Sequence, residues 1–383
     1  MPQSVGPTPR GTAQMAVLDG RGSDTSLTFD AITRRRSACA MLAFAYSALI
    51  QPWLLLCILP FLLLYPPISW CTPQPLSATW SLLSISTGLL YYLYWTADVD
   101  APFRGGHQRT WMRRLPLWRW VAEYFPMKLI PSAELKAWTK ATEDGAVATT
   151  LPSSVNYLVG YHPHGPIAIG ALIGFATDAL DFPKIFPGIK SFLATLNIHF
   201  GVPFHRDFVL SGGTVSVAKG SLTYLLDPEV GGATGNLVVV PVGGAREALE
   251  SRPGKYVIEL SRRFGFFKIA LTTGCHLMPC LGFGETRMFD QVSNPRGSRL
   301  RQFQEWFTTK VTVSPPLLYS KTILPHRFPL NIVLGRPITC TKNANPSEEQ
   351  VSELRELYRQ ALLDLFNQYR PLYDPTAQDI EFI

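Results

Sequence analysis

Two long apolar stretches most constrain how this chain can fold. Residues 38–64 and 76–95 contain no charged side chain. A bilayer core of about 30 Å is crossed by about 20 helical residues, so each stretch is long enough to span it. Pro52 and Pro60 interrupt the first stretch, which leaves a kinked span or a re-entrant segment open. The alternative interpretation is a pair of buried core helices in a soluble protein.

Clusters of arginine flank the two apolar stretches. An arginine triplet, residues 34–36, precedes the first stretch, and Arg104, Arg109, Arg113 and Arg114 follow the second. Because the cytosolic flanks of membrane segments are rich in Lys and Arg, both flanks are predicted to be cytosolic. Three tryptophans are candidate anchors at the membrane interface: Trp70, Trp80 and Trp95. The sequence therefore predicts a membrane hairpin over residues 34–97, with both termini in the cytosol.

The composition agrees with membrane attachment. Only 16% of the residues are charged, whereas a soluble globular chain has about 25%. The net charge of +7 suits an anionic partner such as lipid headgroups or the phosphates of a cofactor. No nucleic-acid-binding motif is present, so nucleic acid is not a predicted partner. The six cysteines show no C-x2-C pairing, which argues against a disulfide scaffold or a cysteine zinc site.

The rest of the chain divides into a tail and one large domain. Residues 1–33 are rich in Gly, Ser, Thr and Pro and are predicted to form a disordered cytosolic tail. Residues 98–383 are predicted to form a cytosolic, membrane-associated domain with an α/β fold, in which helices flank a mostly parallel central sheet. Apolar runs predict strands buried on both faces at residues 156–161, 236–241, 277–283 and 331–335. Helices are predicted at residues 214–226, 255–264 and 266–275.

The last helix has the clearest pattern. Asn345, Pro346 and Glu348 are predicted to cap its start. Apolar and aromatic residues then recur at helical spacing: Val351, Leu354, Tyr358, Leu362, Leu365 and Tyr369. This helix is predicted to pack on the core.

A His-Pro-His-Gly segment follows the first predicted strand. Pro163 restricts the backbone of His162 and fixes its own φ, and Gly165 allows close backbone approach after His164. A rigid histidine suits a general base, because its side chain titrates near neutral pH. Taken alone, the segment also fits an ordinary rigid turn. No third ligand with zinc spacing accompanies the two histidines, so no metal is predicted.

A glycine-rich turn follows the second predicted strand. The N–H groups of Gly243 and Gly244 can bind a phosphate or an oxyanion, and Glu247 can orient a histidine. A basic segment at residues 262–268 then places Arg263 and Lys268 beside phenylalanines, which suits a polyanion that carries an acyl chain. Structural turn residues and solvated surface charge are the alternatives. The sequence lacks a G-x-S-x-G nucleophile elbow and a G-x4-G-K-[ST] phosphate loop.

Read together, these blocks resemble the diacylglycerol acyltransferase type-2 and monoacylglycerol acyltransferase family. The resemblance covers most of the chain, and it rests on the joint order of short blocks. These blocks are Tyr124-Phe125-Pro126, Tyr161-His162-Pro163-His164-Gly165, Phe186-Pro187-Gly188, Gly243-Gly244-Ala245 with Glu247-Ala248-Leu249, Arg263 to Lys268, Pro279 to Glu285, and Gly335-Arg336-Pro337-Ile338.

The resemblance implies a glycerolipid acyltransferase-like fold and an acyl-CoA-dependent O-acyltransferase of the endoplasmic reticulum membrane and lipid droplet surface. The predicted reaction makes triacylglycerol from diacylglycerol, with acyl-CoA as co-substrate and no other cofactor. Monoacylglycerol or a long-chain alcohol is the alternative acceptor. A non-catalytic lipid-droplet protein and a hydrolase are alternatives of other classes. Membrane lipid is a predicted partner, and homo-oligomer formation is left open.

The predicted mechanism uses His164, supported by His162, as the base that removes the acceptor proton. More distant glycerolipid acyltransferases carry His-x4-Asp, but Ile167 and Ile169 stand at the fifth positions here. Glu247 is therefore the candidate orienting acid. The candidate oxyanion donors are the N–H groups near Gly165, Gly243 and Gly244, and the candidate acyl-CoA-binding residues are Arg206, Arg263 and Lys268.

Overall fold

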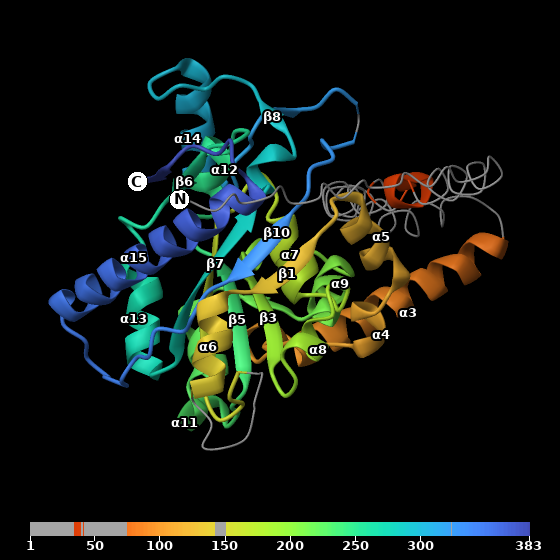
Figure 1. Ribbon diagram of the computed structural model, residues 1–383. Coiled ribbons are helices and arrows are strands. Elements are labelled where there is room, and N and C mark those ends of the chain that lie inside the picture. Colours follow the sequence, from red (N-terminus) through yellow and green to blue (C-terminus); the bar gives the residue numbers. More distant parts are fainter. Residues whose placement is uncertain (1–33, 40, 42–74, 142–150, 323) are drawn as a thin grey trace, which may run out of the picture.

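A seven-stranded sheet forms the centre of the molecule (Figure 1). The computed structural model describes residues 34–39, 41, 75–141, 151–322 and 324–383. The strand order is β1-β10-β7-β2-β5-β3-β4. The bounds of these strands are β1 Lys128–Pro131, β2 Tyr157–His162, β3 Lys190–Thr195, β4 Thr214–Ser216, β5 Asn236–Pro241, β7 His276–Phe283 and β10 Asn331–Leu334.

Five neighbouring strands of this sheet, from β7 to β4, are mutually parallel. Strand β10 runs antiparallel to β7, and β1 pairs in parallel with β10. Two small sheets complete the β structure, β6 (Tyr256–Ile258) with β11 (Ile380–Phe382) and β8 (Asp290–Gln291) with β9 (Leu318–Tyr319). The predicted α/β fold with a mostly parallel sheet is confirmed.

Helices cover both faces of the sheet. From residue 75 onward, the α-helices of the described chain are α3 Pro75–Ala97, α4 Thr110–Arg113, α5 Pro116–Tyr124, α6 Ala133–Ala141, α7 Ile169–Phe175, α8 Phe182–Ile185, α9 His205–Gly212, α10 Lys219–Leu226, α11 Pro228–Gly231, α12 Ala245–Glu250, α13 Phe264–Thr273, α14 Arg299–Val311 and α15 Glu348–Tyr373. Short 3-10 turns are η2 Ala101–Phe103, η3 Asn197–Phe200 and η4 Glu285–Arg287.

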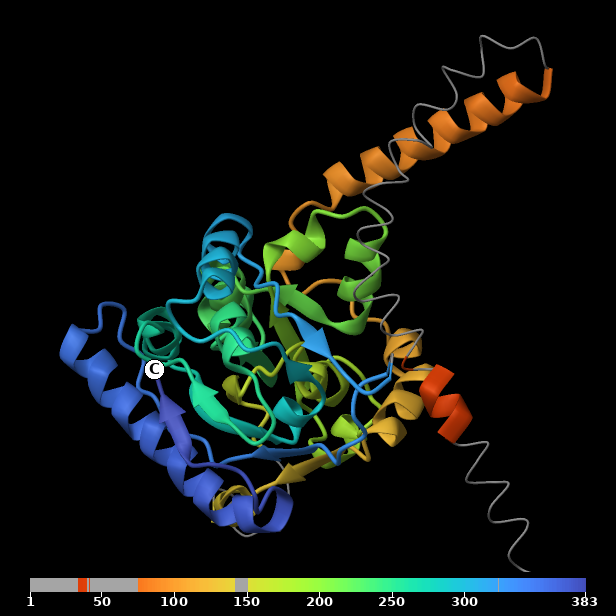
Figure 2. The same ribbon diagram turned by 90° about the horizontal axis from the view of Figure 1, so that it is seen from above.

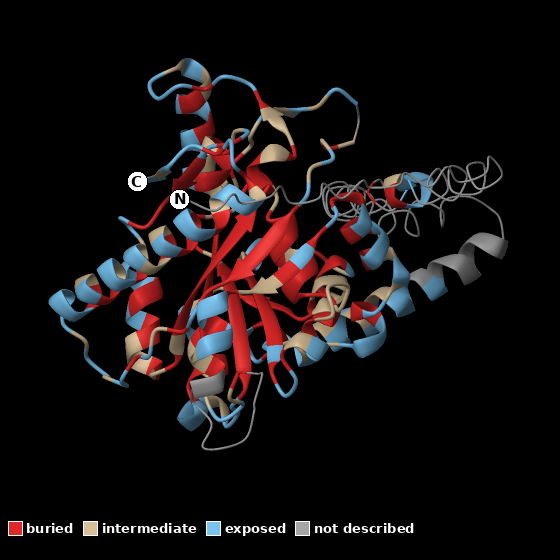
Figure 3. Cartoon of the chain, in the orientation of Figure 1, coloured by how far each residue is buried: buried red, intermediate tan, exposed pale blue. Residues whose placement is uncertain are grey.

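Alternate residues of each central strand enter two separate hydrophobic clusters. In β2, Val159 packs with α5 and α7, whereas Leu158 packs with α10, α13 and α15. In β5, Val239 and Val238 divide in the same way. Both faces of these strands are therefore buried, as Figure 3 shows, and this explains their nearly continuous apolar sequences.

Four strands were predicted close to their observed positions, but two helices were not. Residues 214–226 form strand β4 before helix α10 begins at Lys219, and residues 255–264 contain strand β6. Both strands have only three residues, which is too short for a period to be visible in the sequence. The third predicted helix, 266–275, corresponds to α13.

The last helix packs on the core as predicted, but its cap lies elsewhere. Ser347 is the N-cap of α15, and its side chain forms a reciprocal capping box with Gln350. Asn345 and Pro346 therefore precede the cap, because the serine hydroxyl satisfies the free N–H groups of the first turn. The six periodic residues are all buried: Val351, Leu354, Tyr358, Leu362, Leu365 and Tyr369.

The second predicted membrane segment forms most of α3, which projects from the body of the molecule (Figure 2). Its large apolar side chains are exposed, among them Leu82, Leu83, Ile85, Leu89, Leu90 and Leu93. This exposure contradicts the alternative that the segment is a buried core helix. None of the helices in the described ranges reaches the length and hydropathy that a bilayer span requires.

The tail, the first apolar segment and the flanking arginines complete the predicted N-terminal region. The tail 1–33 and nearly all of the first segment, with Trp70, lie outside the described residues. Arg113, one of the arginines that follow the second segment, is buried and lies 2.9 Å from Asp178. Its guanidinium also donates to the carbonyl oxygens of Phe175 and Gly212, so this arginine holds the fold together. The other three, Arg104, Arg109 and Arg114, are exposed.

Candidate active site

The predicted catalytic residues and the glycine turn lie at one edge of the sheet. Strands β5, β2 and β7 are neighbours with β2 in the middle, and the carboxyl ends of parallel strands meet at the same edge. His162 is the last residue of β2, the Gly243-Gly244 turn follows β5, and helix α12 then carries Glu247. Segments about 80 residues apart in the sequence thus meet, as parallel α/β topology requires.

Glu247 contacts both histidine residues. Its carboxylate is buried, and Oε2 accepts a hydrogen bond from the backbone N–H of His164 at 2.6 Å. Its Oε1 lies 3.3 Å from Nδ1 of His162 and accepts from the backbone N–H of Glu259 at 3.0 Å. A buried carboxylate needs such donors to offset its desolvation. The structure therefore brings the predicted orienting acid together with both histidines.

The two histidines differ in exposure. The side chain of His162 is fully buried, its ring lies 6.0 Å from that of Tyr358, and its Nε2 has no hydrogen-bond partner in the described part of the chain. His164 is half-buried, and its Nδ1 lies 2.9 Å from the carbonyl oxygen of Gly165. An Nδ1–H group that donates to this carbonyl leaves Nε2 as the basic atom. Only His164 is open to an incoming group.

The protonation of His164 also suits a base. Burial lowers the pKa of His164, and the nearby positive charge of Arg263 acts in the same direction. The hydrogen bond to Gly165 and the charge of Glu247 oppose this shift without cancelling it. The imidazole is therefore neutral at neutral pH and can accept a proton.

Arg263 joins the two histidines and Glu247 in what we call the histidine cluster. Its Nη2 donates to the carbonyl oxygen of Gly243 at 2.6 Å, so it fixes the glycine turn. Its Nε is buried and, within the described residues, makes no hydrogen bond. Lys268 is exposed on α13, the helix that begins directly after Arg263. Arg263 thus lies at the site, and Lys268 lies one helical turn further along the same segment.

Arg206 lies in a different place. It is 1% exposed, its Nη2 lies 2.8 Å from Oδ2 of Asp98, and its guanidinium stacks 5.1 Å from the Trp95 ring. No face of this side chain remains for a phosphate, and we leave it out of the acyl-CoA site. Trp95, a predicted membrane anchor, is half-buried in this contact.

Arg206 belongs to a set of residues that attaches α3 to α9, which we call the anchor cluster: Tyr91, Tyr94, Asp98, Arg206 and Asp207. The hydroxyls of Tyr91 and Tyr94 donate to Asp207 at 2.6 and 2.8 Å. The backbone N–H of Phe204 donates to the Tyr91 hydroxyl at 2.7 Å. These partners lie more than 100 residues apart, so the sequence could not show that Arg206 is already paired.

One buried acid of the site edge was assigned no role from the sequence. Glu285 follows strand β7 and is fully buried, with its Oε2 2.6 Å from the hydroxyl of Tyr161. The available signal was its place directly after a strand that neighbours β2. That place puts a carboxylate at the same sheet edge as His162.

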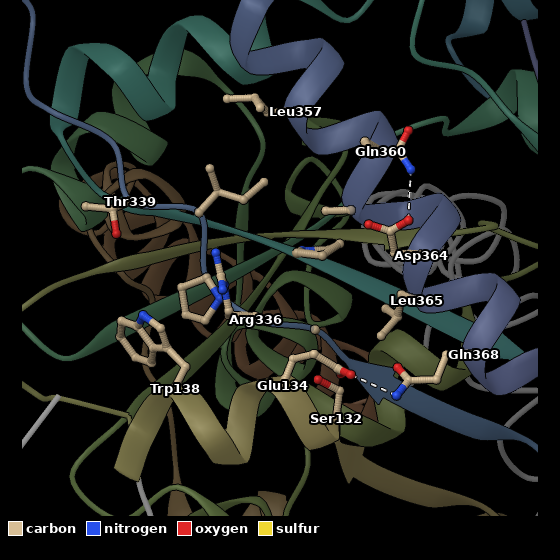
Figure 4. Close-up of a pocket in the computed structure, with 15 residues that line it drawn as sticks. Ser132, Glu134, Trp138, Arg336, Thr339, Leu357, Gln360, Asp364, Leu365 and Gln368 are labelled. Atoms are coloured by element: carbon tan, nitrogen blue, oxygen red, sulfur yellow. Dashed lines mark hydrogen bonds between the residues drawn. The ribbon is translucent and has the colours of Figure 1, made fainter. Parts of the chain in front are cut away.

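A cleft of about 610 Å³ lies away from this edge, between α6, α15 and the segment after β10 (Figure 4). Arg336, Trp138 and Leu365 are among its lining residues, and one hydrogen bond, from Gln368 to Glu134, crosses it. None of the predicted site residues lines this cleft.

The chain is similar along most of its length to known acyltransferases. The sequence model of the family described as "Diacylglycerol acyltransferase" matches residues 76–382. The chain therefore belongs to the diacylglycerol acyltransferase family, and it is an acyltransferase.

Individual relatives agree with this assignment. A 2-acylglycerol O-acyltransferase 1 of Bos taurus is 38% identical over 74% of this chain and 82% of its own length. A diacylglycerol O-acyltransferase 1 of Schizosaccharomyces pombe is 36% identical over 77% of this chain and 82% of its own length. The solved acyltransferase PlsC from Thermotoga maritima covers 90% of this chain and 97% of its own, with 11% identity and a TM-score of 0.38, a likeness too weak to bear on the fold.

Proposed function

We propose that this acyltransferase moves a fatty acyl group from acyl-CoA to the free hydroxyl of diacylglycerol and so makes triacylglycerol. The observation that carries the proposal is the half-buried, neutral His164, whose backbone N–H donates to Glu247, in a chain of this family. Monoacylglycerol is the second candidate acceptor, because relatives named for 2-acylglycerol match this chain as well as those named for diacylglycerol.

His164 acts as the general base in this proposal. Its Nε2 takes the proton of the acceptor hydroxyl while the hydroxyl oxygen attacks the thioester carbon. The tetrahedral intermediate then collapses, and the coenzyme A sulfur leaves with the proton that His164 returns. A positioned base contributes roughly 10²- to 10⁴-fold to such a step. The thioester is already activated, so no covalent acyl-enzyme is needed.

The glycine turn supplies the oxyanion donors. In the described part of the chain, the backbone N–H groups of Gly243 and Gly244 donate no hydrogen bond to the protein. Arg263 holds this turn through the Gly243 carbonyl. Gly165, next to His164, is the third candidate donor. One such donor is worth about 3 to 4 kcal/mol in a transition state.

The phosphates of acyl-CoA bind to Arg263 and Lys268 in this proposal. The unpartnered Nε of Arg263 supports the assignment, because a buried guanidinium nitrogen without an acceptor is costly unless a ligand supplies one. Lys268 is exposed on the same segment and adds a second positive charge.

Membrane attachment brings the lipid acceptor to the site. Diacylglycerol is almost insoluble in water and arrives through the bilayer, whereas acyl-CoA arrives from the cytosol. The exposed apolar side chains of α3 support membrane attachment. The hairpin and its place at the endoplasmic reticulum and the lipid droplet surface are what the family resemblance implies.

An acceptor panel tests the proposed function. Microsomes that contain the chain or its His164→Ala variant receive labelled oleoyl-CoA with diacylglycerol, monoacylglycerol, a long-chain alcohol or no acceptor. We expect triacylglycerol from the unchanged chain and a loss of at least about 100-fold in the variant. His326→Ala, a partly exposed histidine paired with Asp290, is the control and should keep full activity. An active His164→Ala variant would remove this histidine from the mechanism.

A further inference from the structure

A second buried glutamate lies beneath the histidine segment, on the face of the sheet away from Glu247. The hydroxyl of Tyr161 donates to Oε2 of Glu285 at 2.6 Å, and the backbone N–H of Gly170 donates to the same oxygen at 3.1 Å. Tyr161 packs in the hydrophobic cluster of α5 and α7, whereas His162 packs against Tyr358 of α15 on the other face. Both side chains of the Tyr161–Glu285 pair are fully buried.

Three glycines from different segments make room for this pair. A Cβ on Gly165 would lie 2.5 Å from Cγ of Glu285. A Cβ on Gly170 or on Gly282 would lie 2.1 or 2.2 Å from the Tyr161 hydroxyl. At such distances any side chain would displace the pair, because protein interiors are close-packed. The pair is therefore in direct contact with strand β7, the turn after His164 and the start of α7.

These contacts hold the histidine segment at both of its ends. Tyr161 is the residue before His162, and Gly165 is the residue after His164. On the other face, Glu247 binds the same segment by accepting a hydrogen bond from the backbone N–H of His164. The backbone that carries His164 thus lies between two buried carboxyl groups, one on each face of the sheet. Neither Tyr161 nor Glu285 can touch a substrate, because both are buried.

We propose that Tyr161 and Glu285 are positioning residues that set where the His164 ring lies. The inference rests on the proposed role of His164 as the base. Proton transfer requires the base nitrogen within hydrogen-bond reach of the hydroxyl, and a misplacement of about 1 Å can cost roughly 100-fold in rate. Loss of the pair therefore lowers kcat, while the binding of acyl-CoA, which uses other residues, is unchanged.

Two substitutions test the pair and one tests its geometry. Tyr161→Phe removes the hydroxyl, and Glu285→Met removes the acceptor at similar volume. Glu285→Gln keeps a carbonyl oxygen that accepts from both Tyr161 and Gly170. The matched control is Tyr157→Phe, which removes a buried tyrosine hydroxyl bonded to Pro152 at the opposite end of the same strand. The readouts are kcat and KM for oleoyl-CoA, together with the melting temperature in detergent.

We expect kcat of Tyr161→Phe to fall about tenfold or more with KM for oleoyl-CoA changed less than twofold. Glu285→Gln should keep kcat within about threefold of the unchanged chain. Tyr157→Phe should lower the melting temperature but leave kcat unchanged. If Glu285→Met does not fold, Tyr161→Phe still decides.

The inference is overturned if Tyr161→Phe shows only a lower melting temperature with kcat unchanged, or if Tyr157→Phe lowers kcat equally. His164→Ala, measured in parallel, separates this failure from failure of the proposed function. An inactive His164→Ala with a fully active Tyr161→Phe contradicts the positioning role alone. An active His164→Ala contradicts the base itself.

Discussion

The histidine cluster and the anchor cluster each contain an arginine and an acidic residue, but their polar atoms are paired to different extents. In the anchor cluster, Arg206 is ion-paired with Asp98 and stacked on Trp95. In the histidine cluster, His162 Nε2 and Arg263 Nε are buried, and neither has a partner in the described residues. A buried polar atom without a partner is costly, so it marks a place where a ligand or a proton is expected. Arg206 is thus a paired charge that stabilises the fold, whereas Arg263 keeps an unpartnered nitrogen at the proposed substrate site.

The largest effect is expected in the histidine cluster. Glu247→Gln puts an amide N–H₂ where the backbone N–H groups of His164 and Glu259 now meet a carboxylate. One of these donors loses its acceptor, and His164 loses its position. We expect kcat to fall about 10²- to 10⁴-fold. Glu250→Gln on the same helix is the control, and equal activity of both variants would contradict the role of Glu247.

The anchor cluster should respond in stability. Arg206→Met leaves His107 as the remaining partner of the partly exposed Asp98 carboxylate, so it should lower the free energy of unfolding by about 1 to 3 kcal/mol. The folded fraction should keep its KM for acyl-CoA, because Arg206 does not bind the phosphates. Arg104→Met breaks an exposed pair with Asp100 and should cost less than about 1 kcal/mol. If Arg206→Met raises KM for acyl-CoA and leaves the melting temperature unchanged, Arg206 belongs to the acyl-CoA site after all.

Acid should act on the two regions in different ways. Burial lowers the pKa of His205, which precedes Arg206, to about 4, with His199 adding to the shift. Between about pH 6.5 and 4 the unfolded chain binds this proton and the folded chain does not, so stability falls as the pH falls, by up to about 3 kcal/mol. His205→Gln should flatten this slope in chemical denaturation.

In the histidine cluster the same acidification should lower activity, because His164 must be unprotonated to act as a base. Its pKa lies below the usual value, so kcat/KM should stay constant at neutral pH and fall only in more acidic buffer. His205→Gln should leave this profile unchanged. A profile that moves with His205→Gln would contradict the separation of the two regions.

The smallest effect is expected at Arg263. Arg263→Gln removes the charge offered to the acyl-CoA phosphates and should raise KM for acyl-CoA about tenfold, which corresponds to about 1.4 kcal/mol. Melting should change little, since the side chain is only half-buried. Arg262→Gln, its exposed neighbour, should keep a normal KM. An unchanged KM for Arg263→Gln would contradict the proposal that Arg263 binds the phosphates of acyl-CoA.

The sequence predicts the sheet edge better than it predicts the partners of single side chains. Long apolar runs such as 236–241 reveal buried strands, and parallel order then places His162, His164 and the Gly243 turn together. Glu247 is the candidate from sequence because it follows the glycine turn and no aspartate stands five residues after either histidine. Glu285 was given no role, since its partner Tyr161 comes from another strand 124 residues away. Arg206 was misplaced because a charge in sequence looks the same whether it is paired or free.

Helix α3 is attached to the domain near one end only, through the anchor cluster. It has 23 residues, and at about 1.5 Å per residue its far end lies about 34 Å from the end that carries Tyr91 and Tyr94 (Figure 2). The hydrogen bonds of Tyr91 and Tyr94 to Asp207, and the ion pair of Arg206 with Asp98, therefore help to fix the direction of the helix axis. A tilt of a few degrees at this joint sweeps the free end through several ångströms. The angle between α3 and the rest of the domain is thus set at this joint, where the five side chains of the anchor cluster meet.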